Sequence, residues 1–284
     1  MSPDSPDRRS TLAQFLLAGL ALGGSRLALG NQGAAPSFGI VPYLPSRRLF
    51  ELYNPLLPVF SKVLGGPVDI SSAADYRQHI SLIRAGNYDI VADSLFISRI
   101  AQREHGHIPL LRTKVGLEVI IVVPKASASR SLQDLAGKSI CLTDRTAALG
   151  VIGLQFLRSR GLPPDDKVRV VRSGSHQNSL ELMLAGHAAA AIVSKTTLAQ
   201  VSPETAQSVR ILATPPAGLA SVVYHVHPRL AKQAQPIREA LLSFANTADG
   251  KRFIDSLGHK GLVPVTDAEM KSLDPAVVEF YRQL

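Results

Sequence analysis

Two stretches of the chain place hydrogen-bond donors where a predicted strand gives way to a predicted helix. They are 143–150 (TDRTAALG) and 172–176 (RSGSH). The first N–H groups of a helix have no partner within the helix, and the helix dipole favours negative charge at that end. In the first stretch Arg145 adds a positive charge and Thr146 a hydroxyl donor, which is the chemistry of a small-anion site. Reversing the charge of Arg145 is therefore expected to weaken binding.

Each stretch also has a purely structural interpretation. Asp144 or Thr146 is able to cap the helix that follows the first stretch, and Ser175 is able to cap the helix that starts at His176. Residue types and spacing leave both interpretations open at both places. Because the carboxyl ends of parallel strands lie together, we expect Thr146 and His176 to face one cleft.

Signatures of catalysis and of metal binding are absent or incomplete in the sequence. There is no G-x-S-x-G, H-E-x-x-H or G-x-G-x-x-G pattern, so we expect neither an enzyme nor a bound cofactor. Two His-x-His pairs, His105/His107 and His225/His227, are the nearest approach to a metal site. A strand would point each pair to one face, but no third ligand is evident, so no metal site is predicted.

Composition excludes several other classes. The 284 residues are 45% hydrophobic and 19% charged, which is enough to bury a large core in one or two domains. The net charge is +9, but the basic residues are scattered, and Trp is absent, so nucleic-acid binding is not expected. Cys141, the one cysteine, cannot form an internal disulfide. We expect it to be a small buried side chain, with a role as a thiol ligand for a soft oxyanion as the alternative.

Residues 1–35 have the order of an export signal and short linker. Arg8 and Arg9 precede an apolar run at 12–23, and 28–30 (ALG) is a small-residue cleavage site. The paired arginines are similar to a twin-arginine signal. We therefore expect a protein exported to the periplasm. The alternative is an ordinary N-terminal helix that packs on the core.

Predicted strands and helices alternate through the rest of the chain. Strands are expected at 37–42, 68–71, 88–92, 118–123, 139–143, 168–172, 188–193, 209–213 and 221–226, and helices at 54–64, 75–84, 95–104, 146–160, 176–185, 228–246, 249–257 and 275–284. Such alternation predicts an α/β protein whose parallel sheets are covered by helices. Ligands of these sheets bind outside the carboxyl ends of the strands.

Several motifs, in order along the chain, are similar to those of a known family. They are 38–42 (FGIVP), 53–56 (YNPL), 84–89 (RAGNYD), 131–138 (SLQDLAGK), 144–150 (DRTAALG) and 174–176 (GSH). With these motifs the chain resembles the phosphonate/phosphate/phosphite-binding family of ABC-transporter periplasmic solute-binding proteins, which have the type II periplasmic binding protein architecture. The resemblance covers about residues 36–284.

The resemblance implies two Rossmann-like lobes joined by a two-strand hinge. The first lobe would hold 36–122 and 216–284, and the second 123–215, with hinge crossings near 122–125 and 213–216. The ligand would lie in the cleft between the lobes. The candidate ligand-binding residues are Tyr43, Ser94, Thr143, Arg145, Thr146, Ala147, Ser175, His176 and Ser194.

The sequence departs from the family pattern at its anion-binding loop. Ala147, Ala148 and Leu149 replace hydroxyl side chains, Arg145 replaces a proline, and Ser94 begins a stretch that lacks the family tyrosine. The resemblance implies a periplasmic solute-binding protein of an ABC importer, with a small oxyanion or organophosphonate as ligand. We expect a monomer that docks on an inner-membrane permease. The alternative is a ligand-sensing protein that partners a membrane receptor or histidine kinase.

Overall fold

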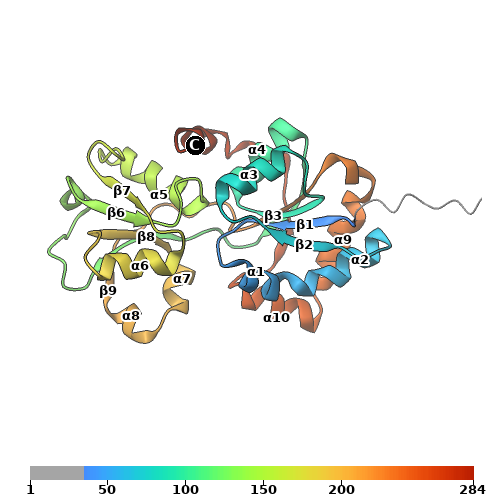
Figure 1. Cartoon of the computed structure of the whole chain (residues 1–284), viewed down its shortest axis with the longest axis horizontal. Helices are drawn as coiled ribbons and strands as arrows, with labels where there is room; N and C mark the ends of the chain where they lie inside the picture. Colours follow the sequence, from blue (N-terminus) through green and yellow to red (C-terminus); the bar gives the residue numbers. More distant parts are fainter. Residues whose placement is uncertain (1–34) are drawn as a thin grey trace, which may run out of the picture. The chain divides into compact units, whose positions relative to one another are not determined.

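Two β-sheets organise residues 35–284, the part of the chain that this computed structural model describes (Figure 1). The first sheet has the strand order β11-β4-β10-β3-β1-β2, and the second has the order β7-β6-β8-β5-β9. The strands of the first sheet are β1 (Ser37–Ile40), β2 (Asp69–Ser72), β3 (Ile90–Asp93), β4 (Ile108–Thr113), β10 (Val223–Val226) and β11 (Leu262–Pro264). Those of the second are β5 (Val119–Pro124), β6 (Ser139–Leu142), β7 (Arg169–Arg172), β8 (Ala190–Ser194) and β9 (Val209–Ala213). We call the parts built on them the first and second lobe.

Strand direction decides where the connecting loops collect. β1, β2 and β3 are parallel, and β10 is antiparallel to both β3 and β4. β11 is antiparallel to β4, so the residues that precede β10 and β11 lie at the same edge as those that follow β1, β2 and β3. In the second sheet β6, β7 and β8 are parallel. Each sheet therefore has one carboxyl edge, the place where open α/β sheets bind ligands.

Helices cover both faces of each sheet (Figure 1). On the first sheet α1 (Ser46–Tyr53), α2 (Leu57–Leu64), α9 (Ala234–Ala245) and α10 (Ala248–Ser256) share one hydrophobic cluster, and α3 (Tyr76–Arg84), α4 (Leu95–His105) and α12 (Asp274–Arg282) share another. On the second sheet α5 (Ala148–Ser159) packs in one cluster, and α6 (His176–Leu184) and α7 (Lys195–Gln200) pack in the other. The short elements are α8 (Pro203–Gln207), α11 (Asp267–Lys271), η1 (Asn54–Leu56), η2 (Leu132–Leu135) and η3 (Pro228–Gln233).

Local sequence explains several of these elements. The apolar run in β5 is buried at every position except its terminal proline, because the strand lies between β8 and β9. Asp75 ends the loop before α3 and accepts a hydrogen bond from the backbone N–H of Gln78 at 2.8 Å, which caps the helix. Cys141 is buried in β6, as expected, and burial raises the pKa of its thiol.

Two chain segments connect the sheets, at 114–118 between β4 and β5 and at 214–222 between β9 and β10. They lie against each other, since the N–H of Gly218 donates to the carbonyl of Leu117 at 3.0 Å. A Cβ on Gly116 would lie 1.9 Å from the Gly218 carbonyl oxygen, so this approach requires glycine. The first connection thus precedes β5, whereas the hinge crossing was expected near 122–125. The residues of an apolar strand do not indicate which of two sheets the strand joins.

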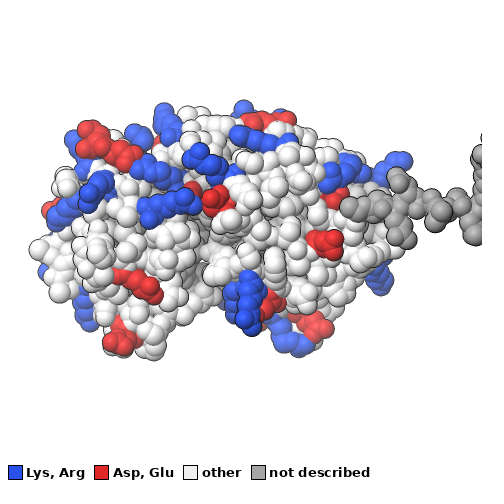
Figure 2. All heavy atoms as spheres, in the orientation of Figure 1, with Lys and Arg blue, Asp and Glu red and all other residues white. Residues whose placement is uncertain are grey.

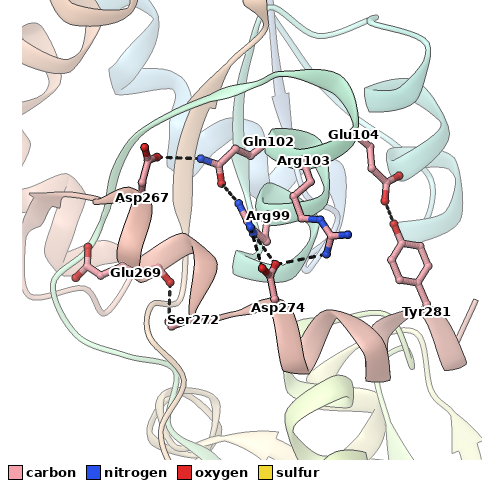
Figure 3. Close-up of polar contacts among 9 residues, drawn as sticks. All are labelled: Arg99, Gln102, Arg103, Glu104, Asp267, Glu269, Ser272, Asp274 and Tyr281. Atoms are coloured by element: carbon pink, nitrogen blue, oxygen red, sulfur yellow. Dashed lines mark hydrogen bonds and ion pairs between the residues drawn. The ribbon is translucent and has the colours of Figure 1, made fainter.

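The C-terminal helix α12 lies between the lobes, against α4 of the first and α5 of the second. Figure 3 shows how it is fixed to α4. The carboxylate of Asp274 accepts hydrogen bonds from Nε and Nη2 of Arg99 at 2.8 and 3.0 Å, and Tyr281 donates to Glu104. Gln102 of the same helix reaches Asp267 of α11 at 3.2 Å. These contacts join the end of the chain to the first lobe.

The structure also contains elements that the sequence pattern did not predict. They are α1, β4, α7, α8, β11 and α11. β4 carries Pro109 and Arg112 and so lacks a clean alternation, and β11 is three residues long. The predicted helix at 54–64 is the η1 and α2 part of a longer helical segment, because α1 precedes the expected start at Asn54.

Within residues 35–284, none of the helices combines the length and the hydropathy that crossing a bilayer requires. The predicted export signal, including the Arg8-Arg9 pair, lies in 1–34, outside the described residues.

Candidate functional site

A cavity of about 470 Å³ lies between the carboxyl edges of the two sheets. Five of the predicted ligand-binding residues line it, namely Tyr43 and Ser94 from the first lobe and Ala147, His176 and Ser194 from the second. The other four, Thr143, Arg145, Thr146 and Ser175, are not among its lining residues. The strand-to-helix junctions therefore meet at one site, but their side chains divide between the cavity and the loops that support it.

Two helices begin at this cavity without a side-chain cap. Ala147 is the N-cap residue of α5 and has no side chain able to accept a hydrogen bond. Ser94 is the N-cap residue of α4, but its side chain makes no capping bond. The Ser94 hydroxyl is buried and has no hydrogen-bond partner within residues 35–284. Unsatisfied N–H groups of two helix starts, one from each lobe, thus adjoin one cavity together with a free hydroxyl.

The neighbouring helices α6 and α7 differ, because serine side chains cap both. Ser175 accepts a hydrogen bond from the N–H of Asn178 at 3.1 Å, and Ser194 accepts one from the N–H of Thr197 at 2.9 Å. For Ser175 the capping interpretation from the sequence is therefore the one observed. Of these four helices, α4 and α5 are therefore the ones whose first N–H groups have no side-chain cap.

Thr146 holds the loop before α5 in place. Its N–H and its hydroxyl both donate to Oδ1 of Asp144, at 2.9 and 2.6 Å. The proton of the hydroxyl is thus used within the loop, and Thr146 is not among the residues that line the cavity with His176. Gly150 in the first turn of α5 lies under the same loop, since a Cβ there would be 2.3 Å from the Asp144 carbonyl oxygen.

Arg145 points away from the cavity. Its guanidinium donates to the carboxylate of Asp165 at 2.7 Å and to the side-chain oxygen of Gln283 at 3.0 Å, and it lowers the pKa of Asp165. The sequence placed this charge in the anion site, because the loop's residue order does not show on which side each side chain emerges. In the structure Arg145 connects the loop to α12.

His176 is held by Thr143, whose hydroxyl lies 2.7 Å from Nδ1 of the ring. Burial lowers the pKa of His176 to about 4, so the ring is uncharged near neutral pH. Thr143 is 2% exposed, which makes it a positioning residue for the imidazole. An uncharged imidazole is able to donate to an anion from one ring nitrogen.

Two carboxylates lie behind the cavity wall, and both have partners. Asp144 pairs with Arg172, with 2.8 Å between Oδ2 and Nε. Asp93 accepts the N–H of Ser94 at 2.6 Å and lies 3.3 Å from Nε2 of His79 and 3.6 Å from Nε2 of His225. Burial opposes ionisation of Asp93, but the two histidines outweigh it and lower the pKa to about 2.

The same cluster accounts for the histidine pairs noted in the sequence. Nδ1 of His107 lies 2.8 Å from Nδ1 of His225, so the two pairs do meet in the core. Burial and the neighbouring His225 ring lower the pKa of His107 to about 2. Within residues 35–284 no group of three or more potential ligands has the arrangement that a metal ion needs.

The cavity has a closed end and an open mouth. The closed end is formed by Tyr76, Ser94 and 147–149, each of them buried. The mouth lies at the other face of the sheets and is lined by residues that the sequence did not single out, namely Arg48, Thr196, Thr197, Gln200, Ser256 and His259. Tyr76 begins the helix after β2, so a search of every strand-to-helix junction in the sequence could have found it. His259 could not be found in this way, because it precedes β11, a strand that the sequence pattern did not predict.

Charge on the surface is dispersed. Figure 2 shows Lys and Arg side chains spread over the visible face of both lobes, with Asp and Glu among them. Among the cavity-lining residues Arg48 is the one with a full charge, and it is exposed and paired with Glu51 at 3.2 Å. Positive potential at the closed end therefore comes from oriented N–H groups rather than from a basic patch.

The chain is similar to known proteins in sequence and in fold. A family model described as "ABC transporter, phosphonate, periplasmic substrate-binding protein" matches residues 38–270. No curated protein sequence matches the chain.

Several solved structures have the same fold. PhnD1 from Prochlorococcus marinus, solved with methylphosphonate, has a TM-score of 0.78 and 15% identity, and the alignment covers 87% of this chain and 98% of that one. A binding protein component of an ABC phosphonate transporter from Pseudomonas aeruginosa has a TM-score of 0.75 and 18% identity. The alignment covers 88% of this chain and 87% of that one. A Xanthomonas citri protein bound to chloride has a TM-score of 0.75 and 19% identity, and the alignment covers 88% of this chain and 98% of that one. At these identities the likeness establishes the fold.

Proposed function

The chain belongs to the phosphonate-binding family of periplasmic substrate-binding proteins of ABC transporters, and on that basis we propose that its cavity binds a small oxyanion or organophosphonate for delivery to an inner-membrane permease. The observation that carries the proposal is the pair of uncapped helix starts at one cavity. Ala147 and Ser94 leave the first N–H groups of α5 and α4 without a side-chain acceptor, and an anion would satisfy both. His176 would add an uncharged donor, whereas the hydroxyl of Tyr43 donates to the hydroxyl of Tyr53 at 3.4 Å.

Calorimetric titration with methylphosphonate, phosphate and sulfate tests this proposal. The critical variant is Ala147→Asp, because Asp is a favoured N-cap whose carboxylate would occupy the N–H groups of α5 and repel an anion. We expect affinity to fall by about 10-fold or more, the effect of one or two hydrogen bonds to a charged group. Ala126→Asp, in an exposed turn, adds the same charge away from the cavity and is the matched control.

Two results would refute the proposal. One is failure of all three anions to bind at low ionic strength. The other is equal affinity in Ala147→Asp and Ala126→Asp when both variants have the far-UV circular dichroism of the wild type.

The remaining features of the proposal concern partners and location. The protein would act as a monomer without nucleic acid and would catalyse no reaction, in keeping with the absence of a catalytic motif from the sequence. It would reach the periplasm by the signal in 1–35, with Arg8 and Arg9 as a twin-arginine element. N-terminal sequencing of exported protein tests the signal, and retention of Met1 would contradict it. The sensor alternative predicts co-purification with a receptor or kinase instead of a permease.

A further inference from the structure

The mouth of the cavity holds a buried polar group that the anion site does not use. His259 follows α10, is 7% exposed, and lines the cavity. Its Nδ1 is buried and has no hydrogen-bond partner within residues 35–284. Leaving such a group unsatisfied costs free energy, and a ligand that supplies the partner recovers it. A ligand in the cavity that reaches this ring is therefore able to form a hydrogen bond with it.

The position of His259 separates it from the closed end. Tyr76, Ala147 and Ala148 of the closed end belong to the hydrophobic cluster on the α3 and α4 face of the first sheet. Leu52 and Leu257, which line the cavity beside His259, belong to the cluster on the α1 and α10 face. A ligand whose anionic group lies at the start of α5 must extend from one face of the sheets toward the other to reach His259.

The mouth joins the two lobes. A Cβ on Gly258 would lie 2.8 Å from Cγ2 of Thr196, so the loop that carries His259 touches the start of α7. Thr197 and Gln200 of α7 also line the mouth. The Thr197 hydroxyl lies 2.7 Å from the Ser194 hydroxyl, whereas Gln200 is exposed. Uncharged donors and acceptors from both lobes therefore surround the outer part of the cavity.

Within the described part of the chain, the lining of the mouth offers a cationic group no carboxylate partner. No Asp or Glu of residues 35–284 lines the cavity, and Arg48 is positive. Glu51, the partner of Arg48, lines an adjoining groove between α1, α2, α9 and α10, which shares Arg48 and Leu52 with the cavity. Burial lowers the pKa of His259 to about 4, so this imidazole is uncharged near neutral pH and accepts or donates one hydrogen bond per ring nitrogen.

The volume agrees with a ligand larger than a bare oxyanion. The cavity measures about 470 Å³, whereas a single water occupies about 30 Å³ of liquid, and an oxyanion of five heavy atoms occupies only a few times that. Space therefore remains between an anion at the start of α5 and the side chain of His259.

We propose that His259 and the mouth around it form a tail subsite, so that the ligand is an oxyanion whose tail ends in an uncharged hydrogen-bonding group such as a hydroxyl, and not in an ammonium. This inference rests on the proposed anion site and adds the class of its ligand. His259 is the specificity-determining residue, because its ring lines the mouth and its Nδ1 has no hydrogen-bond partner within residues 35–284.

The test uses three probes with one anionic head and tails of similar length, namely ethylphosphonate, 2-hydroxyethylphosphonate and 2-aminoethylphosphonate. Calorimetry should give the hydroxyl probe about 5- to 10-fold higher affinity than the ethyl probe, which lies within the range of about 2- to 13-fold that one net hydrogen bond supplies. The ammonium probe should bind more weakly than the hydroxyl probe, since its charge finds no carboxylate.

Three variants assign the preference to the histidine. His259→Leu should reduce the hydroxyl-over-ethyl preference to below about 2-fold, because the hydrogen bond that distinguishes the two probes is removed. His259→Gln retains a donor and an acceptor and should preserve most of the preference. His187→Leu, at an exposed histidine outside the cavity, should behave as the wild type.

The outcomes separate this inference from the proposed function. Equal binding of the three probes, tightest binding of the ammonium probe, or an unchanged preference in His259→Leu would overturn the tail subsite and leave the anion site intact. Failure of all three probes and of phosphate and sulfate would overturn both.

Discussion

Arg158 and Glu279 form an ion pair between α5 of the second lobe and the C-terminal helix, with 3.3 Å between Nε and Oε2. The Glu279 side chain is 2% exposed, and Arg282 and Gln283 also donate to it, at 3.1 and 2.6 Å. At the other end of α12, Asp274 is bound by Arg99 of α4 (Figure 3). α12 therefore fastens a helix of each lobe, and α5 is the helix whose start faces the cavity.

Replacing the buried carboxylate should loosen this connection. Glu279→Gln removes the charge that Arg158 and Arg282 share, and we expect the free energy of unfolding to fall by about 1–3 kcal/mol. Denaturant unfolding measures the change. Asp249→Asn, which breaks the exposed pair with Arg252, is the control and should change stability by less than about 1 kcal/mol. Equal effects of the two changes would show that α12 is not held by its buried pair.

A methyl group at Gly150 should displace the start of α5. The Cβ of Gly150→Ala would lie 2.3 Å from the Asp144 carbonyl oxygen, so the loop or the helix must move. We expect a loss of about 1–3 kcal/mol in stability and a clear loss of methylphosphonate affinity, because the helix N–H groups shift with the backbone. Gly66→Ala, where nothing lies within 4 Å of the added carbon, is the matched control. Unaltered affinity in Gly150→Ala would argue against an anion at this helix start.

Arg145 should contribute little to ligand affinity, contrary to what its place in the sequence suggests. Because its guanidinium binds Asp165 and Gln283, Arg145→Ala should change methylphosphonate affinity by less than about 2-fold. Calorimetry at two ionic strengths measures this, and Ala147→Asp in the same assay shows that a loss is detectable. A 10-fold weaker affinity in Arg145→Ala would mean that the side chain turns into the cavity when a ligand binds.

Stability should fall as the pH is lowered from about 6.5 toward 4. Burial lowers the pKa of His259 to about 4, whereas the unfolded chain has an ordinary value near 6.5, so the unfolded state binds more protons in this interval. The group stabilises the fold above pH 6.5 and loses that contribution as the pH falls, by at most about 1.4 kcal/mol per pH unit. His176, whose pKa is lowered in the same way, adds to the slope.

Unfolding measured from pH 7 to pH 4 tests this dependence. His259→Gln removes one titrating group and should flatten the slope relative to the wild type. A wild-type stability that is constant over the interval would contradict the prediction.

Strand-to-helix junctions could be read from sequence because periodic apolar runs and turn residues are local signals. The junctions before α5 and α6 were located in this way, and Ala147 and His176 do line the cavity. Which side chain at a junction faces inward could not be read, since that depends on the helix start and on competing partners. The Thr146 hydroxyl donates to Asp144 in a local turn, which was one of the two interpretations that the sequence left open. Arg145 instead pairs with Asp165, 20 positions along the chain, and no local pattern indicates that pairing.

The amino-acid sequence by itself determined the α/β alternation, the two strand-to-helix junctions and the family, because these depend on local periodicity and on ordered motifs. Only the tertiary structure decided that Ser94 and Ala147 bring two uncapped helix starts to one cavity, that His259 stands at its mouth, and that α12 joins the lobes. Those relationships link residues more than 50 positions apart, and they arise from strand order and packing between elements, which no local pattern encodes.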